Sequence, residues 1–328
     1  MLLTVMGLCS LGELRLKEGR LREAEHLFRR ALDQVTDARG ERLPIAGQAL
    51  VWLGELARER NALDRAEDYL VEGLDLIDKW GPIAGIEANT VLARVRHAQG
   101  DGQAARRALE EAARLAIRFD ATEMDDLLVA MHTARIDALE GEFVAVESWI
   151  TSRGLDELEP DNLRLDATVE LHLRKYELVV LGLARILEGR PREAVCFLSP
   201  LLSWVASRGR WGIGIEALAL LAAAHHMSGE SGIALERLEE ALTRARNEGY
   251  VRTFVEIGEP MAQLLYRAAE HTICADYAGR LLAAYPSLVT RGARPPTKGD
   301  LVEPLSEREL EVLALIADGL TNQETAQR

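Results

Sequence analysis

The residues of this sequence that could do chemistry are scattered and form no compact catalytic motif. Neither the His-Glu-x-x-His zinc motif nor the Gly-rich phosphate loop ending in Gly-Lys-Ser/Thr occurs. His225 and His226 are adjacent, so on a helix they would point about 100° apart and would not easily share a metal ion. Carboxylate pairs such as Glu110 with Glu111 fall on the charged faces of expected helices. We therefore expect neither an enzyme nor a metal site.

A second set of side chains is suited to binding. Polar and aromatic residues recur on the first helix of each expected helix pair, which is the helix that usually lines the concave wall of a repeat array. They are Trp52, Arg94, His97, His132, Arg135 and Trp211. Each has an alternative interpretation as an ordinary packing or solvated residue, and the tryptophans fit an inter-helix core as well. We take the six as a candidate groove for an effector molecule or a partner protein.

The elements that must position these residues form a tandem array. The sequence Leu-Gly-Glu-Leu at 11–14 recurs 42 residues later at 53–56. A Gly or Asn turn recurs about every 40 residues, and a small apolar residue follows each turn about five positions later. Gly and Asn tolerate the left-handed conformation that ends a helix. The turns are Gly19, Asn61, Gly100, Gly141, Gly189 and Gly229, and the small residues are Ala24, Ala66, Ala105, Val146, Ala194 and Ala234.

Each second helix of the array carries one apolar stripe. The spacing of the stripe residues is that of a single helical face, and charged residues such as Arg29 and Asp33 lie on the opposite face. Because no helix pair can bury its stripe alone, neighbouring pairs must stack. We predict an all-α, right-handed α-solenoid of helix hairpins with a concave inner surface; the alternative is a plain helical bundle. The first stripe is Ala24, Leu27, Phe28, Ala31, Leu32 and Val35.

Composition and charge limit the function further. The 328 residues carry a formal net charge of −14, which argues against the whole chain binding nucleic acid because phosphate binding needs a basic face. Cys9, Cys196 and Cys274 are widely spaced, so we expect free, mostly buried thiols in a reducing cytosol. The apolar start lacks the basic residues of a signal peptide, and no apolar run of about 18 residues occurs. We expect a cytoplasmic protein without a membrane segment.

The C-terminal part has a different pattern. Residues 286–304 are rich in Gly and Pro and lack periodicity, which is typical of a linker. Ser306 with Glu309 forms a capping box that starts a short helix, and Gly319 ends it. Thr321 or Asn322 is placed to cap the next helix. We therefore divide the chain into an array at 1–285, a linker at 286–304 and a small helical module at 305–328.

Three stretches of the array resemble the sensor region of MalT-like members of the LuxR-type transcription regulators. Each unit is similar to a tetratricopeptide repeat, with a period near 40 instead of the usual 34 or so. The resemblance spans nearly the whole chain and is loosest at 120–175. Residues 305–328 are similar to the first two helices of the LuxR-type helix-turn-helix. The three stretches are 177–194, 249–261 and 277–285.

The resemblance implies a bacterial regulator in which the array senses an effector or a partner and controls a DNA-binding module. The residues Thr321, Asn322 and Gln323 then correspond to the DNA-contacting part, although the family usually has Lys at the third position. It also usually has Ile where this chain has Thr325. Coupling would pass through the linker or through self-association. Large members of the family carry an ATPase module upstream that this sequence lacks, so we expect no cofactor.

The tail as it stands is not expected to bind DNA. A helix-turn-helix reads bases with its recognition helix, and the sequence ends at Arg328 before that helix. Residues 305–328 hold two basic and five acidic residues, a net charge of −3. We expect a shortened regulator or one whose DNA-binding module is degenerate, with promoter DNA bound only through a complete module. The alternative function is a helical-repeat scaffold that binds partner proteins and has no DNA role.

Overall fold

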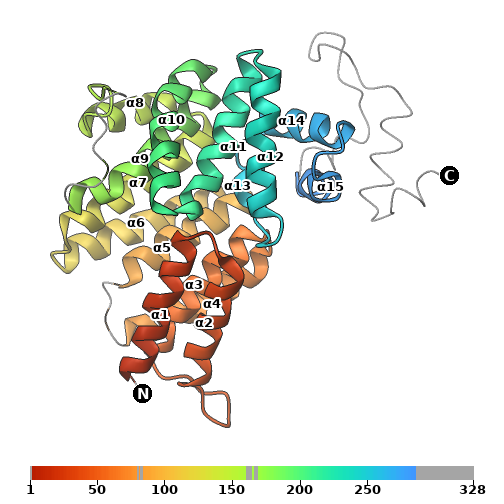
Figure 1. Ribbon diagram of the computed structural model, residues 1–328. Helices are drawn as coiled ribbons and strands as arrows, with labels where there is room; N and C mark the ends of the chain where they lie inside the picture. The colour runs from red at the N-terminus through yellow and green to blue at the C-terminus, as the bar shows by residue number, and fades with distance from the viewer. Residues whose placement is uncertain (1, 80, 82–83, 160–164, 166–168, 286–328) are drawn as a thin grey trace.

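The computed structural model describes residues 2–79, 81, 84–159, 165 and 169–285. In this part the chain is helices and connecting turns, with one isolated bridge between Thr36 and Arg42 (Figure 1). The helices are α1 (Leu2–Lys17), α2 (Leu21–Asp33), α3 (Ala46–Glu59), α4 (Leu63–Asp78), α5 (Ala84–Ala98), α6 (Gly102–Arg118), α7 (Glu123–Glu140), α8 (Phe143–Ser152), α9 (Val169–Leu187), α10 (Pro191–Arg208), α11 (Trp211–Met227), α12 (Ser231–Ala245), α13 (Arg252–Val255), α14 (Glu259–Glu270) and α15 (Ala275–Ala283).

The helices form two layers. Successive helices pack as hairpins, from α1 with α2 to α11 with α12, and α14 packs on α15. The odd-numbered helices from α1 to α11 also pack side by side and make an inner layer, with the even-numbered helices outside. The predicted all-α solenoid of stacked helix hairpins is therefore confirmed.

The repeated turns and small residues have the predicted roles. All six turn residues have positive φ, from 62° at Asn61 to 88° at Gly100, which is the left-handed region that ends a helix. All six small residues that follow them are 0% exposed. Each turn therefore reverses the chain, and each small residue lets the second helix pack closely against its neighbours.

A recurring glycine brings the two helices of a pair together. Gly12 and Gly54 belong to the repeated Leu-Gly-Glu-Leu sequence, and Gly182 takes the same place in α9. A Cβ at Gly12 would lie 2.4 Å from the ring of Phe28, and one at Gly54 would lie 2.6 Å from Cγ of Leu70. At Gly182 the distance to Leu198 would be 2.8 Å. The second helix thus fills the space that a side chain would occupy.

The array curves until its later helices touch its first ones. Helix α11 packs on α1, and α13 packs on α3. The contact with α1 is close, since a Cβ at Gly212 would lie 2.2 Å from the carbonyl oxygen of Leu16. Residues 248–256, which we call the closing segment, complete the ring. The sequence predicts a concave inner surface, and the structure adds that the closing segment lies against the inner helices.

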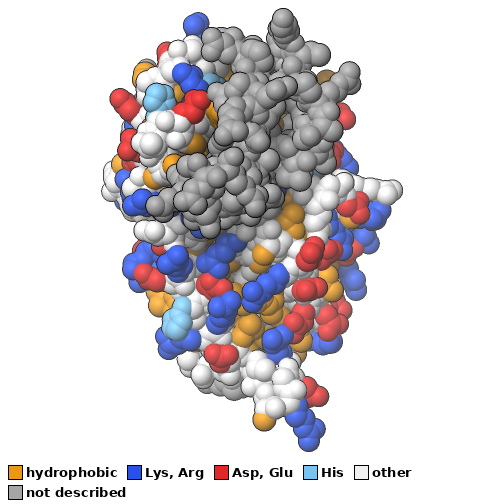
Figure 2. Space-filling model, turned by 90° about the vertical axis from the view of Figure 1, so that its right-hand side faces the viewer, with side chains coloured by type: hydrophobic (Ala, Val, Ile, Leu, Met, Phe, Trp, Pro, Cys, Tyr) orange, Lys and Arg blue, Asp and Glu red, His pale blue; other side chains and the backbone are white. Residues whose placement is uncertain are grey.

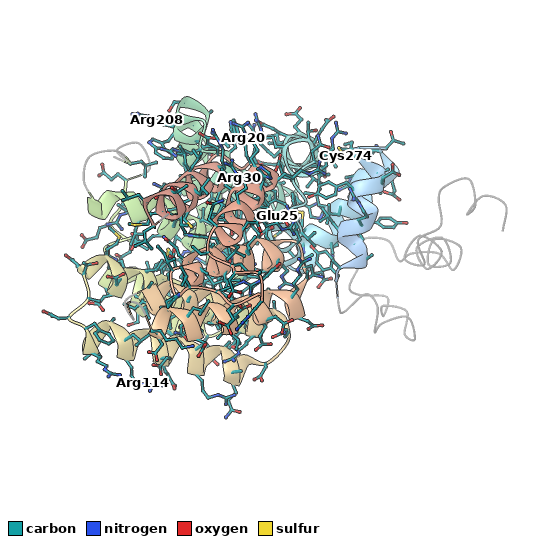
Figure 3. All side chains as sticks on the ribbon, turned by 90° about the horizontal axis from the view of Figure 1, so that it is seen from below. Arg20, Glu25, Arg30, Arg114, Arg208 and Cys274 are labelled. Atoms are coloured by element: carbon teal, nitrogen blue, oxygen red, sulfur yellow. The ribbon has the colours of Figure 1, made fainter. Side chains whose placement is uncertain are left out.

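Charged side chains are frequent on the described surface (Figure 2). On the face drawn in Figure 2, acidic and basic side chains lie close together on the described surface, with apolar areas between them. Arg114 of α6 points away from the molecule (Figure 3) and pairs with Glu111 on the same helix. These pairs are exposed and contribute little to stability.

The cysteines and the apolarity of the helices bear on two further predictions. Cys9 is buried, but Cys196 is exposed and Cys274 partly so, and the expectation of mostly buried thiols was therefore wrong. Cys196 is exposed because it lies on the outward face of α10. Within the described residues, none of the helices has the length and apolarity that a bilayer crossing requires. The linker at 286–304 and the module at 305–328, with Thr321, Asn322 and Gln323, lie outside the described residues.

Candidate functional site

Charged side chains gather where the inner helices face the closing segment. We call this set the inner wall. Four inner helices (α3, α5, α7 and α11) and the closing segment contribute to it. Its members are Glu55, Arg58, Arg94, His132, Arg135, Glu216 and Glu256.

Arg58 is the most enclosed cation of the inner wall, with 2% of its side chain exposed. Its Nε and Nη2 donate to the two carboxylate oxygens of Glu55 at 3.0 and 2.9 Å. Nη2 also donates to Glu59, and Nη1 donates to Oε1 of Glu256, each at 2.9 Å. All three guanidinium nitrogens are therefore hydrogen-bonded, as a buried charge requires.

Glu256 joins the closing segment to two inner helices. One oxygen accepts from Arg58 on α3, and the other accepts from Nη2 of Arg135 on α7 at 2.8 Å. The same nitrogen of Arg135 donates to Glu216 on α11 at 2.7 Å. Burial alone would raise the pKa of Glu256, but Arg135 and Arg58 outweigh it and hold that pKa well below its usual range.

Glu59 holds the closing segment through backbone groups. Its Oε1 accepts from the N–H groups of Val251 at 3.2 Å and Thr253 at 3.0 Å. Its main-chain oxygen also accepts from Val251 at 2.9 Å. One residue at the end of α3 therefore satisfies the donors at the start of α13, where a helix has no internal partners for its first N–H groups.

Arg94 and His132 form the side of the inner wall where the side chains have fewer hydrogen-bond partners among the described residues. Arg94 has 16% of its side chain exposed and donates through Nη1 to Glu55 at 3.1 Å. Burial and the neighbouring Arg58 lower the pKa of Arg94. Burial, Arg94 and Arg135 lower the pKa of His132 to about 3, so its imidazole is neutral at pH 7. His97, one turn after Arg94, also has a pKa lowered by burial.

The pKa values of two carboxylates on the inner helices, Glu55 of the inner wall and Glu87 outside it, are shifted in opposite directions. Burial would raise the pKa of Glu55, but Arg58 and Arg94 lower it to about 2. Glu87 lies on α5 nearer the first helix, where burial and then the charges of Glu13 and Glu55 raise its pKa to about 7. Glu55 therefore stays ionised, whereas Glu87 is close to half-protonated at neutral pH.

The structure brings four of the six predicted groove residues together. Arg94, His97, His132 and Arg135 all lie at or beside the inner wall. The two tryptophans do not. Trp52 stacks on Phe28, with ring centroids 6.1 Å apart, and belongs to the core between the first two hairpins. Trp211 lies at the contact of α11 with α1, where the guanidinium of Arg244 sits 3.2 Å above its ring.

Sequence reasoning missed the acidic half of the inner wall and the closing segment. Glu55 was visible as the Glu of the second Leu-Gly-Glu-Leu copy, and Arg58 follows it by three residues. Arg252 and Glu256 share one helical face at i and i+4, which is a usable pairing signal. That Glu256 faces α3, however, depends on the curvature of the whole array.

The end of the described chain is attached to the closing segment. The hydroxyl of Tyr277 donates to the carbonyl oxygen of Tyr250, and that of Tyr285 donates to the carbonyl oxygen of Phe254 at 3.0 Å. Both phenols are buried. Tyr285, the last described residue, is therefore bonded directly to α13 of the closing segment.

The inner wall is made of groups that form hydrogen bonds and ion pairs. Within the described residues, no group of three or more His, Cys, Asp or Glu side chains is arranged to hold a metal ion. The wall offers guanidinium and imidazole donors and ionised carboxylates, which orient a polar ligand by hydrogen bonds.

Comparison with known proteins places the array in a family. The family model described as MalT-like TPR region, where TPR stands for tetratricopeptide repeat, matches residues 1–271. No curated protein matches the chain. The matched range contains the whole inner wall and helices α1 to α14, and it confirms the resemblance to the MalT-like sensor region for residues 1–271. Residues 305–328 lie beyond this range. The chain therefore belongs to the family of MalT-like TPR regions.

Proposed function

We propose that this chain is the signal-sensing and protein-interaction region of a bacterial LuxR-family transcription regulator, acting in the cytoplasm by binding and without a cofactor. The observation that carries the proposal is a largely buried, charged inner wall inside an array that belongs to the MalT-like TPR family. The similarity of residues 305–328 to the start of a LuxR-type helix-turn-helix supports it. Helical-repeat arrays commonly bind ligands or partner proteins on their inner surface.

Binding at the inner wall would be coupled to the C-terminal module through the closing segment. An effector that contacts the wall competes with, or reinforces, the bonds of Glu256 to Arg58 and Arg135. Tyr285 is bonded to Phe254 of the same segment. A shift of α13 would therefore also shift Tyr285, the residue that precedes the linker. An effector acts in this way only if it binds two arrangements of the segment with different affinity.

The experiment compares transcript profiles of the native host across a panel of carbon sources. Strains carry the intact gene, a gene deletion, a deletion of residues 305–328, Arg135→Lys or the matched control Arg237→Lys. Lys keeps the charge but cannot bridge Glu216 and Glu256 as the guanidinium does. We expect both deletions to change the same transcripts, Arg135→Lys to alter their response to growth conditions, and Arg237→Lys to behave as wild type.

The second candidate is a protein-binding scaffold without a DNA role. The net charge of −14 for the chain, and of −3 for residues 305–328, favours it because like charge repels DNA. Transcript profiles that stay unchanged on deletion of the gene would establish the scaffold and overturn the regulator. For the chain as it stands we expect no sequence-selective DNA binding in a mobility-shift assay at physiological salt.

A further inference from the structure

Arg94 has a hydrogen-bonding edge that the protein does not use. Its Nη1 donates to Glu55, but its Nε is buried and has no hydrogen-bond partner among the described residues. The Nε and Nη2 hydrogens point in parallel, and this edge of a guanidinium matches the two oxygens of a carboxylate. A buried donor without a partner is costly, so an unused edge at a partly open position indicates a missing acceptor.

His132 supplies a second unused group at the same place. Its Nδ1 is buried and has no partner among the described residues. His132 lies on α7, which packs directly against α5, the helix that carries Arg94. A neutral imidazole can carry its proton on Nδ1 and donate it. Two helices that pack together therefore each carry, on the inner wall, a buried nitrogen without a partner in the described part of the chain.

The charges around Arg94 select the kind of acceptor. Glu55 already pairs with Arg58 through two hydrogen bonds, so Arg94 is only partly compensated. An anion would supply the missing charge. Ionised Glu55 and Glu256 nearby would repel a phosphate dianion more strongly than a single negative charge. A carboxylate has both the charge and the fork geometry.

We propose that the free edge of Arg94 and Nδ1 of His132 form a binding site for the carboxylate group of a small-molecule ligand. Arg94 takes both carboxylate oxygens along its Nε–Nη2 edge, and His132 donates to one of them. The inference rests on the proposed function in that it states the chemistry of the effector. The rest of the ligand lies over the exposed part of the wall.

The test uses the whole purified chain and trifluoroacetate, observed by ¹⁹F NMR line broadening. The net charge of −14 disfavours non-specific anion binding, so broadening reports a specific site. We expect broadening that acetate reverses and inorganic phosphate does not, and none with neutral trifluoroacetamide. Arg94→Met should weaken binding roughly ten-fold or more, because hydrogen bonds to charged groups are lost.

Matched variants separate the site from the fold. Arg96→Met removes a guanidinium from the same helix that pairs with Glu67 outside the wall, and it should bind as wild type. Arg94→Met should fold, because Glu55 keeps Arg58; His132→Phe tests the same site without removing a charge. Unchanged broadening in both Arg94→Met and His132→Phe, displacement by phosphate in preference to acetate, or no broadening with wild type would each overturn the proposal. None of these outcomes depends on transcription, so the regulator proposal stands or falls separately.

Discussion

Glu256 and Glu87 lie on the same inner surface, yet the pKa of one is lowered and that of the other is raised. Glu256 accepts from two arginines of other helices, whereas Glu87 is partly buried without such a partner among the described residues and lies near the like charges of Glu13 and Glu55. A lowered carboxyl pKa stabilises the fold at neutral pH, and a raised one destabilises it there. The inner helices and the closing segment therefore carry both a buried ion pair that stabilises the fold and a carboxyl group, Glu87, whose ionisation is opposed by burial and by like charge.

Replacing Glu256 by Gln should destabilise the protein. The side chain is 5% exposed, and its loss of charge leaves Arg58 and Arg135 buried with one counter-charge fewer. We expect the free energy of unfolding to fall by about 3 kcal/mol, the usual effect of breaking a buried ion pair, measured by urea denaturation at pH 7. Glu111→Gln, whose partner Arg114 is exposed, should change it by less than about 0.5 kcal/mol. Equal losses in the two variants would contradict the role of Glu256.

The variant Glu87→Gln should stabilise the protein in a pH-dependent way. The Glu87 carboxyl ionises near pH 4.5 when unfolded and near pH 7 when folded, so the folded state binds the extra proton and loses stability as pH rises between those values. Gln removes this loss. We expect no gain at pH 4.5 and a gain of about 1–2 kcal/mol above pH 7, allowing for the partial exposure of Glu87. A gain that stays constant from pH 4.5 to 8 would refute the assignment.

At the scale of the elements, the two helices of a pair come closest where a small residue of the first helix faces a large side chain of the second. Gly12, Gly54 and Gly182 each face the residue 16 positions later on the second helix. The other hairpins have alanine there, as at Ala93 and Ala134, which are 0% and 1% exposed. A side chain of at most one carbon at this position is therefore a requirement of the repeat, and larger residues would separate the helices.

Two glycine-to-alanine changes in α1 should have opposite effects. A Cβ at Gly12 would meet the buried ring of Phe28, so Gly12→Ala should destabilise the protein by roughly 1–3 kcal/mol through overpacking. A Cβ at Gly7 would meet nothing within 4 Å, so Gly7→Ala should stabilise it by about 0.5–1 kcal/mol through helix propensity. Thermal unfolding midpoints should move down for the first and up for the second. Movement in the same direction would show that packing does not decide the effect.

Local pattern predicted the elements well because each signal is contained in one hairpin. The turns at Asn61 and Gly100 and the buried Ala66 and Ala105 follow from spacing alone. The candidate site was half predicted. Arg94, His132 and Arg135 were found because they lie on first helices, but Glu256 was not, since its partners are 198 and 121 residues away in sequence. The repeat pattern of the sequence does not predict how strongly the array curves, and therefore does not predict that Glu256 meets α3 and α7.

At the scale of the whole molecule, the array is closed by two contacts. One joins α1 to α11, where Gly212 meets the backbone of Leu16, and the other joins α3 to the closing segment. Both are long-range and neither is large, because each rests on one helix end or one short helix. The ring therefore holds its shape through a few specific bonds on top of the stacked hairpins.

Gly212→Leu should open the first contact. The clash is with backbone, 2.2 Å from Leu16 O, which cannot move aside without shifting α1. We expect a larger radius of gyration by small-angle X-ray scattering and faster proteolysis of α1 and α2. Gly232→Leu is the matched control, because Gly232 is likewise the second residue of its helix and a Cβ there meets nothing within 4 Å. An unchanged radius of gyration for Gly212→Leu would mean that the contact with α1 does not hold the ring.

The bonds of Glu59 to Val251 and Thr253 span 192 and 194 residues of chain. Hairpins form from local contacts and fold early. The closing segment, in contrast, can bind Glu59 only after residues 251–253 have been synthesised. At a synthesis rate of roughly 5–20 residues per second, the first two hairpins leave the ribosome roughly 10–40 s before their partner does. During that interval the end of α3 around Glu59 lacks the closing segment that covers it in the folded protein, and a nascent chain stalled before residue 248 should be cut in α3 by a protease that spares the released protein.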